Sequence, residues 1–189
     1  MPDFPVIESA RLRFVELSAK YAERIFEYAS NEEVTKYVAW NRHETIDDTY
    51  EFLKWSRSQS EDLNHFDFGL IIKASGEFIG TTGTSNFLPD EKSIDFGYVL
   101  NKKYWGNGFA TEAAREIRAF AFQLDDVEYL RAYVFDANLP SRRVLEKCGF
   151  INRGPAKCPS LASPDERVAL KYELNKNDYL ENPLISDFI

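Results

Sequence analysis

The chain has 189 residues, of which 44% are hydrophobic, and this length and apolar content suit one globular domain with a substantial core. Its formal net charge of -8 and pI near 4.9 argue against nucleic acid as the main partner, because phosphate backbones select basic surfaces, and are compatible with a cationic substrate. No run approaches the roughly 18 apolar residues of a membrane helix, and the N-terminus lacks the basic and apolar regions of a signal peptide, so we expect a cytoplasmic protein without a membrane partner.

Periodic patterns predict two helices and three strands in the first half of the chain. In order, these are a strand over 6–16, a helix over 19–30, a helix over 46–60 and two strands over 65–74 and 77–88. Ser18 stands at the N-cap position of the first helix. The second helix is expected to turn Tyr50 and Leu53 inward. Gly76 lies in the turn between the two strands.

The second half alternates strands and helices. In order, we expect a strand over 93–100, a helix over 109–124, a strand over 127–135, a helix over 139–148, a loop over 154–166 and a last strand over 167–174. Asn138 is a natural helix cap, and Gly149 stops the second of these helices. This order predicts an α/β fold with a mixed sheet and helices on both faces. We expect a single domain over 1–175 and a C-terminal tail over 176–189.

The cysteines and histidines show no pattern of a disulfide framework or a metal site. Cys148 and Cys158 stand ten positions apart, and neither His43 nor His65 is grouped with them. Cys148 lies at helical spacing with Val144 and is expected to be a buried apolar residue. The sequence is compatible with a monomer or a homodimer.

A glycine loop over 104–110 separates the strand over 93–100 from the following helix. Gly106 and Gly108 lack a Cβ, so the backbone there can turn sharply and approach a ligand. The first amides of a helix have no intrahelical partner and carry the positive end of its dipole, which favours an anion, most often a phosphate. A dinucleotide fingerprint fails because Thr111 replaces the third glycine, and a nucleoside-triphosphate loop fails because no Gly-Lys-Ser/Thr run exists.

Two segments together carry a family resemblance. SIDFGYVLNKKYWGNGFATEA, followed about thirty residues later by NLPSRRVLEKCGF, resembles the GNAT superfamily of acetyl-CoA-dependent N-acyltransferases. The branch it looks like is that of the ribosomal-protein N-terminal acetyltransferases (RimJ/RimL-like). The resemblance implies the GNAT fold, with a mostly antiparallel central sheet splayed between its two central strands, and it implies acetyl-CoA as cofactor.

The resemblance also implies a set of contacts to coenzyme A (CoA). In relatives the loop amides bind the pyrophosphate, and the preceding strand carries a bulge and pairs with the pantetheine arm. Arg142 and Arg143 are placed to reach the ribose 3′-phosphate, because arginine suits phosphate, and the alternative is that both are solvated residues on a helix. The expected contacts are Tyr98, Val99, Leu100, Lys103, Tyr104, Trp105, Gly106, Asn107, Gly108, Phe109, Ala110, Asn138, Ser141 and Arg142. Lys103 departs from the Gln or Arg common in the family, and Asn138 could instead be a plain helix cap.

The expected reaction is direct attack of an amine on the acetyl thioester, with a backbone N–H near Val99 as oxyanion donor. Asp95 is the one acid on the central strand, where the family often has Glu, and it is assigned as general base acting through water. Many members have a tyrosine four residues after the Ser141 position, but Leu145 stands here, so Ser141 is assigned to the leaving thiolate. Alternatively, Asp95 is a solvent-facing strand residue without a catalytic role, and Ser141 is an ordinary residue in the first turn of a helix.

The acceptor is predicted less directly. Tyr37, Trp40, Asn41 and His43 lie in the segment that forms the substrate wall in relatives, although aromatic residues there are as often core. Deprotonating an α-amino group at pH 7 costs roughly 1.4 kcal/mol, against about 4.6 kcal/mol for a lysine side chain, so a modest base favours a protein N-terminus. The alternatives are a small amine, such as an aminoglycoside, a polyamine or an amino-acid-like metabolite, and a CoA-binding sensor without turnover.

Overall fold

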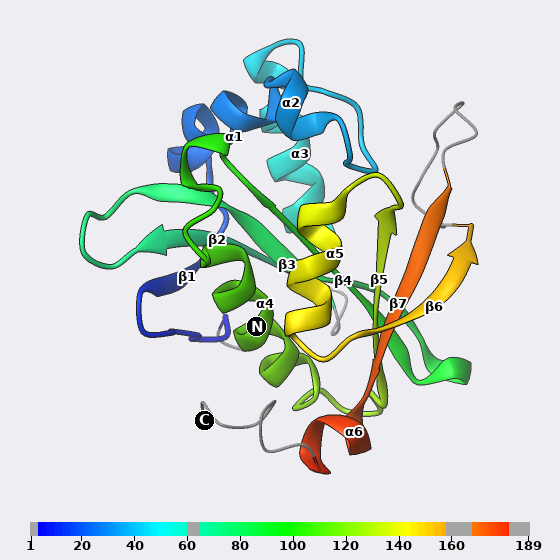
Figure 1. The fold of residues 1–189 in the computed structure, drawn as a ribbon. Helices are drawn as coiled ribbons and strands as arrows, with labels where there is room; N and C mark the ends of the chain where they lie inside the picture. The colour runs from blue at the N-terminus through cyan, green and yellow to red at the C-terminus, as the bar shows by residue number, and fades with distance from the viewer. Residues whose placement is uncertain (1–3, 60–64, 158–167, 182–189) are drawn as a thin grey trace.

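In the computed structural model, which describes residues 4–59, 65–157 and 168–181, seven strands form one sheet with helices on both faces (Figure 1). The strand order is β1-β2-β3-β4-β5-β7-β6, and every neighbouring pair is antiparallel except β4 with β5. The strands are β1 (Leu12–Glu16), β2 (Phe66–Ile72), β3 (Phe78–Leu88), β4 (Ser93–Leu100), β5 (Tyr129–Phe135), β6 (Ile151–Ala156) and β7 (Ala169–Asn175). The mixed, mostly antiparallel sheet confirms the fold class expected from the sequence.

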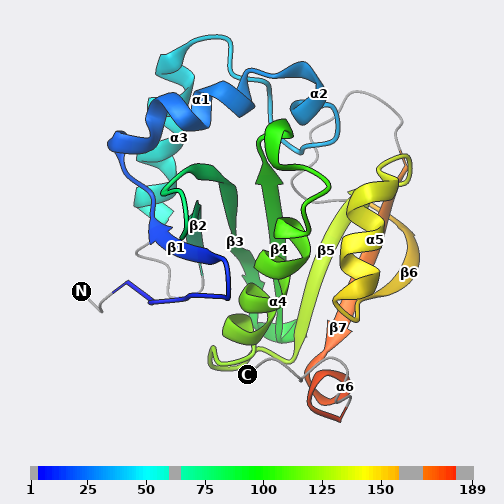
Figure 2. The same ribbon diagram turned by 60° about the vertical axis from the view of Figure 1, so that its left-hand side comes forward.

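The helices divide between the two faces of the sheet. One face carries α4 and α5, the other carries α3, and α1 and α2 lie at the end of the sheet where β4 ends (Figures 1 and 2). The helices are α1 (Ala22–Ala29), α2 (Glu32–Thr35), α3 (Ile46–Gln59), α4 (Phe109–Ala121), α5 (Leu139–Lys147) and α6 (Lys176–Glu181). The predicted bounds of the two longest helices agree with the structure to within three residues.

Each face of the sheet has its own core. On α4, residues at three- and four-residue steps such as Ala113, Ile117 and Ala121 are fully buried, as an amphipathic helix requires. The smaller core on the other face contains Ile25 of α1 and Leu53 of α3. The sheet is therefore covered on both sides.

Two neighbouring strands, β4 and β5, separate along part of their length. Only three residue pairs join the two strands, from Ser93 with Tyr129 to Asp95 with Arg131. Beyond Asp95, β4 runs on to Leu100 while still paired with β3 throughout, so its other edge is left without a strand partner. The predicted splay between the two central strands is therefore confirmed. We call this opening the split.

Three local expectations are wrong. The bulge expected on the central strand lies on β3, where the register with β4 shifts between Ser85 and Leu88, next to Asn86 with φ of 51°. Tyr50 remains 46% exposed, because the stripe that α3 buries beside Leu53 contains the small polar residues Thr49 and Ser56. Ser18 precedes a short 3₁₀ turn and makes no capping hydrogen bond with its side chain.

The C-terminal region also differs from expectation. Residues 154–156, expected in a loop, belong to β6, while 158–166, including Cys158, lie outside the described residues. The expected tail begins with α6, whose Tyr179 is 5% exposed and stacks on Phe122 at 5.2 Å between ring centroids. This contact explains why a polar segment is helical, since burying one aromatic ring anchors it to the core.

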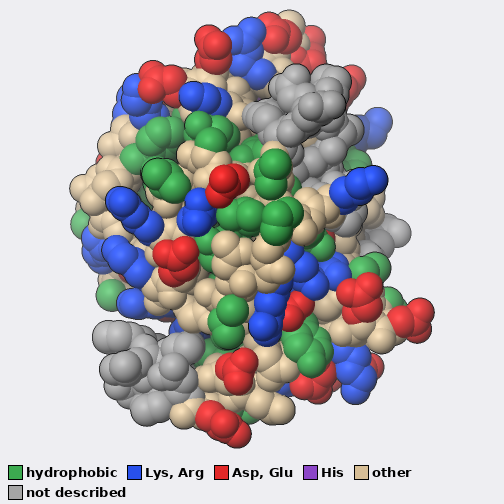
Figure 3. All heavy atoms as spheres, turned by 45° about the vertical axis from the view of Figure 1, so that its right-hand side comes forward, with side chains coloured by type: hydrophobic (Ala, Val, Ile, Leu, Met, Phe, Trp, Pro, Cys, Tyr) green, Lys and Arg blue, Asp and Glu red, His purple; other side chains and the backbone are tan. Residues whose placement is uncertain are grey.

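The surface has a mixed distribution of charge. On the face shown in Figure 3, basic and acidic side chains are interspersed, without the basic patch that nucleic acid requires. Within the described ranges, no helix has the length and apolar character to cross a bilayer. The same ranges contain no group of three His, Cys, Asp or Glu side chains placed to hold a metal ion.

Candidate active site

The loop after β4 has the conformation that its glycines allow. Gly106 and Gly108 have φ of 76° and 81°, in the left-handed region that other residues rarely adopt. The side chain of Asn107 folds back and donates to the carbonyls of Tyr104 and Trp105, at 3.2 and 3.1 Å. Two left-handed glycines around a bracing asparagine therefore turn the chain directly into the first residue of α4.

The loop presents unpaired amides. Among the described residues, no acceptor is found for the backbone N–H groups from Gly106 to Ala110. A Cβ built on Gly106 would meet nothing within 4 Å, so the approach to these amides is open. With the positive end of the α4 dipole behind them, they form a cradle for an anion.

Arg11 and Glu112 hold this loop against the segment that leads into β1; we call the pair the clamp. The Arg11 guanidinium contacts Glu112 Oε2 at 2.6 Å, donates to the Asn107 carbonyl at 3.0 Å and lies 4.4 Å from the centre of the Phe109 ring. Ser9 Oγ donates to the other carboxylate oxygen at 2.7 Å. Burial opposes ionisation of Glu112, but these donors outweigh it and lower its pKa.

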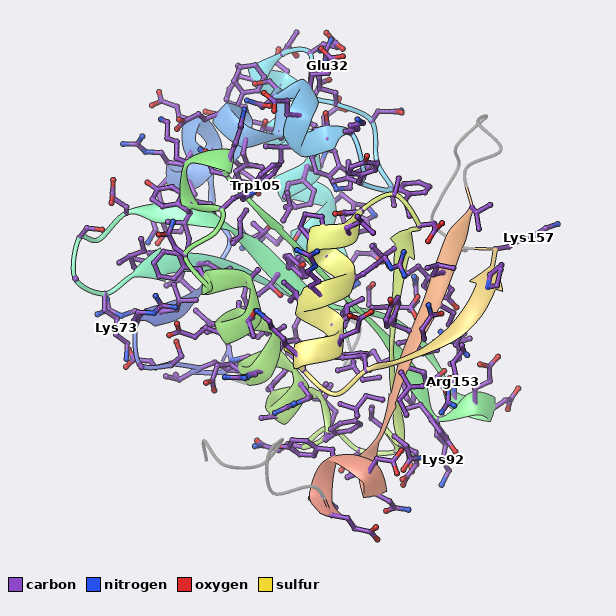
Figure 4. The ribbon with its side chains drawn as sticks, in the orientation of Figure 1. Glu32, Lys73, Lys92, Trp105, Arg153 and Lys157 are labelled. Carbon is purple, nitrogen blue, oxygen red and sulfur yellow. The ribbon has the colours of Figure 1, made fainter. Side chains whose placement is uncertain are left out.

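Along β4, the backbone N–H groups of successive residues point alternately toward β3 and toward the split. Asn101 donates its N–H to Ile79 of β3, so by strand alternation Val99 also faces β3, and Tyr98 and Leu100 face the split. The Leu100 carbonyl accepts a hydrogen bond from the indole N–H of Trp105 at 2.8 Å, at the end of β4 where the loop begins (Figure 4). The N–H groups of Tyr98 and Leu100 therefore point into the opening.

Two hydroxyl groups meet on the α5 side of the split. Tyr98 donates its hydroxyl to Ser141 Oγ at 3.1 Å, and the Asn138 side chain accepts the Ser141 N–H at 3.3 Å as the cap of α5. Burial raises the pKa of Tyr98 to about 12, so its hydroxyl stays protonated and keeps the proton that it donates to Ser141. The proton of Ser141 is therefore available to a further acceptor.

Asp95 lies at the closed end of the split and is 7% exposed. Arg131 of β5 contacts its Oδ1 at 2.8 Å and also reaches Glu91 at 2.8 Å, while Asn86 donates to its Oδ2 at 3.1 Å. Burial raises the pKa of Asp95, and Arg131 and Asn86 offset part of that rise. Both oxygens of this carboxylate are thus already engaged by the protein.

Sequence comparison decides the family. A model described as the acetyltransferase (GNAT) domain matches residues 11–151. The chain belongs to the GNAT acetyltransferases. The match contains β1 through α5, and so includes the clamp, the glycine loop and the split. The fold, the N-acetyltransferase activity and acetyl-CoA as cofactor are confirmed by this membership, and the unpaired loop amides and the split fit the pyrophosphate and amide-bearing arm of that cofactor.

Curated relatives of this GNAT acetyltransferase cover most of its length. It is 28% identical over 151 residues to the "Uncharacterized N-acetyltransferase YoaA" of Bacillus subtilis, covering 80% of this chain and 85% of that protein. It is 26% identical over 191 residues to the "FsC-acetyl coenzyme A-N(2)-transacetylase" of Aspergillus fumigatus, covering 93% and 78%. These two names share the N-acetyltransferase activity.

Solved structures have the same fold. An acetyltransferase of the GNAT family from Bacillus anthracis superposes with a TM-score of 0.79 at 25% identity, covering 92% of this chain and 99% of that one. The spermidine N-acetyltransferase of Vibrio cholerae, in complex with CoA and spermine, gives 0.77 at 16%, covering 92% and 100%. The RimL ribosomal L7/L12 alpha-N-protein acetyltransferase, in complex with CoA, gives 0.79 at 13%, covering 90% and 98%.

Two cationic side chains expected at CoA are bound within the protein. Lys103 forms an ion pair with Glu27 of α1, and its N–H donates to the Asn101 side chain at 3.1 Å. Arg142 contacts Asp136 at 2.7 Å and donates to the Tyr172 hydroxyl at 3.3 Å. Their contacts to CoA stay predictions, and the structure joins them instead to neighbouring elements.

The four expected substrate residues lie between α2 and α3. His43 Nδ1 bonds Thr49 Oγ1 at 2.8 Å, and Trp40 packs 5.3 Å from the His43 ring while 39% exposed. Tyr37 lies 6.4 Å from Phe135 at the end of β5, and Asn41 is exposed. Tyr37 is therefore the member of this group with a ring contact to β5 among the described residues.

Sequence reasoning missed the contacts that join positions far apart in the chain, although it had named Asp95, Tyr98 and Ser141. The clamp joins positions 101 residues apart, the hydroxyl pair 43 apart, and the Asp95–Arg131 ion pair 36 apart. Arg11 was an outward residue of an alternating strand, and no local pattern distinguishes it from Arg13. A signal was available only for Tyr98, whose strand position alternates with the buried Phe96 and so indicates the α4 face.

Proposed function

We propose that this enzyme acetylates the α-amino group of a protein or peptide by direct attack on the acetyl thioester. The observation that carries the proposal is the state of the carboxylate at the split. Asp95 is held by Arg131 and Asn86, so no strong, free base lies on β4. An amine with pKa near 8 loses its proton at a cost of roughly 1.4 kcal/mol at pH 7, and needs only modest help.

Bound acetyl-CoA supplies the activated acetyl group. The loop amides from Gly106 to Ala110 hold its pyrophosphate, and the clamp fixes their direction. The N–H groups of Tyr98 and Leu100 face the split and serve the pantetheine amides and the carbonyl oxygen on which charge develops. One well-placed donor of this kind contributes about 3 kcal/mol to acyl transfer. This moves the oxyanion donor one residue from the Val99 position expected from the sequence.

The leaving thiolate is served by the hydroxyl pair. Ser141 donates its proton toward the sulfur, and Tyr98 donates to Ser141 and keeps that proton correctly directed. The pair fills the role that Leu145, 2% exposed in the core, cannot fill. A thiol with pKa near 8.5 leaves with little assistance, so positioning is the larger contribution.

A small polyamine is the second candidate acceptor. The net charge of -8 favours a cation, and the neighbour from Vibrio cholerae is named for spermidine. The two candidate acceptors differ chemically, because a polyamine has primary amines of high pKa and no peptide backbone.

Release of free CoA thiol, followed with a thiol reagent, tests the proposal. We expect turnover with peptides that have a free α-amino group and none with the same peptides N-terminally blocked but containing lysine. Turnover with spermidine and with no peptide would favour the second candidate. Tight binding of CoA, measured by calorimetry, without turnover on any amine would show a binding protein and refute both.

A further inference from the structure

Asp67, Gly83 and Gly97 form one row across three neighbouring strands. β2 pairs Asp67 with Gly83, and β3 pairs Gly83 with Gly97. Phe68, next to Asp67, packs on Phe120 of α4 with ring centroids 5.6 Å apart, so Asp67 points to the opposite face. The row therefore begins at a carboxylate and ends on β4, at the border of the split.

The two glycines leave this row clear of side chains. A Cβ at Gly83 would lie 3.1 Å from Asp67 Oδ1, so the carboxylate extends beside the Gly83 position toward β4. The same Cβ would lie 2.1 Å from the Phe66 carbonyl, which excludes any other residue at Gly83. A Cβ at Gly97 would meet nothing within 4 Å. No side chain therefore stands between Asp67 and the split along this row, and the space is open at Gly97.

Asp67 has a different environment from Asp95. Its one ion-pair partner among the described residues is His65, whose Nε2 lies 3.1 Å from Oδ2, and its side chain is 23% exposed. Within the described ranges, Asp67 also interacts electrostatically with Tyr28 of α1, whose hydroxyl is paired with Thr81 at 3.0 Å. A carboxylate within reach of water and not held by arginine is suited to accept a proton.

We propose that Asp67 is the proton acceptor for the incoming amine, acting through one water that lies over Gly83 and Gly97. This rests on the proposed acetyl transfer, with the acceptor entering on the face opposite α4 and α5. The amine nitrogen forms a bond to the acetyl carbon and the carbon–sulfur bond breaks. The surplus proton of the amine passes through the water to Asp67, and the sulfur leaves as a thiolate that accepts a hydrogen bond from Ser141 and takes its proton from solvent.

Asp67→Asn separates this role from a structural one. The assay uses as acceptor whichever of spermidine and a set of peptides with free N-termini the wild type acetylates most efficiently. We expect its kcat/KM to fall at least tenfold at pH 7 and the loss to shrink above pH 9, where the amine loses its proton unaided. The dissociation constant of CoA and the melting temperature should stay unchanged. Asp125→Asn, at an exposed turn after α4, is the matched control.

Gly97→Ala tests the clear row independently. The added methyl has open space and an ordinary strand conformation, so the fold and the binding of CoA should be unaffected. We expect the KM of the acceptor to rise at least threefold, and calorimetry to show weaker binding of spermidine or peptide to the CoA complex. Unchanged kinetics in Asp67→Asn, or a loss independent of pH, would overturn the inference while leaving acetyl transfer intact. A wild type that binds CoA and acetylates nothing would overturn both.

Discussion

Replacing Arg11 by methionine tests whether the clamp shapes the phosphate loop. Methionine keeps an unbranched stem over Phe109 and removes the guanidinium, while Glu112 retains Ser9 and the Arg11 backbone N–H. The hydrogen bond from the guanidinium to the Asn107 carbonyl contributes about 1.5 kcal/mol, being charge-assisted. The half-exposed ion pair with Glu112 adds about 0.5 kcal/mol.

The sum of these two contributions is about 2 kcal/mol, without the contact of the guanidinium with the Phe109 ring. It corresponds to a roughly 30-fold weaker dissociation constant if the loop loses its shape completely without Arg11. We expect the constant for CoA, measured by calorimetry, to weaken between about threefold and 30-fold on this basis. Acetyl-pantetheine, which lacks the pyrophosphate, should bind both proteins equally.

Arg13→Met is the matched control for this experiment. Arg13 lies two positions further along, in β1, and its side chain is 56% exposed and forms an ion pair only with Glu8, at 3.3 Å, among the described residues. It should leave both ligands unaffected. An unchanged dissociation constant for CoA in Arg11→Met would show that the loop keeps its shape without the clamp. Equal losses for CoA and acetyl-pantetheine would show that the damage is not confined to the phosphate loop.

Three further predictions concern single groups. Gly108→Ala forces alanine to φ of 81°, costs roughly 1–2 kcal/mol and should weaken CoA binding several-fold by calorimetry, whereas an unchanged constant would mean that the loop relaxes. Tyr98→Phe should raise the thiol pKa of bound CoA by about half a unit, read from thiolate absorbance, with Tyr28→Phe on the other face without effect. Because the folded-state pKa of Glu112 is lowered, its stabilisation is present above its ordinary value of 4.5 and lost as pH falls through the lowered value. Glu112→Gln should therefore melt below wild type at pH 7 and match it under acid, and a gap that persists at pH 3 would contradict this.

The loop could be read from the sequence because its conformation is local. Two glycines with positive φ and a helix start fix the backbone wherever the rest of the chain lies. The split came from the resemblance, since no residue pattern on β4 or β5 shows that pairing stops after three residues. The bulge was transferred in the same way and was placed on the wrong strand.

The rest depends on contacts between distant segments. The sequence identifies Asp95 as an acid on the central strand, but it does not show that Arg131 of β5 forms an ion pair with this carboxylate. The sequence gives no signal for a role of Asp67, because an acid flanked by phenylalanines in a strand has the pattern of an ordinary outward residue. Only the register of three strands shows that two glycines lie between it and the split.

The two faces of the sheet therefore hold their substrates by different means. The cofactor side uses backbone amides, glycines and a helix terminus, and these survive when side chains change. On our proposal, the acceptor side is built from side chains such as Tyr37 and Asp67, and these can change without disturbing the sheet. Neighbours at 13% and 16% identity share the fold, and their titles name a ribosomal protein and spermidine. Substitutions on the cofactor side should thus change the affinity for CoA, and substitutions on the acceptor side should change kcat/KM for the amine.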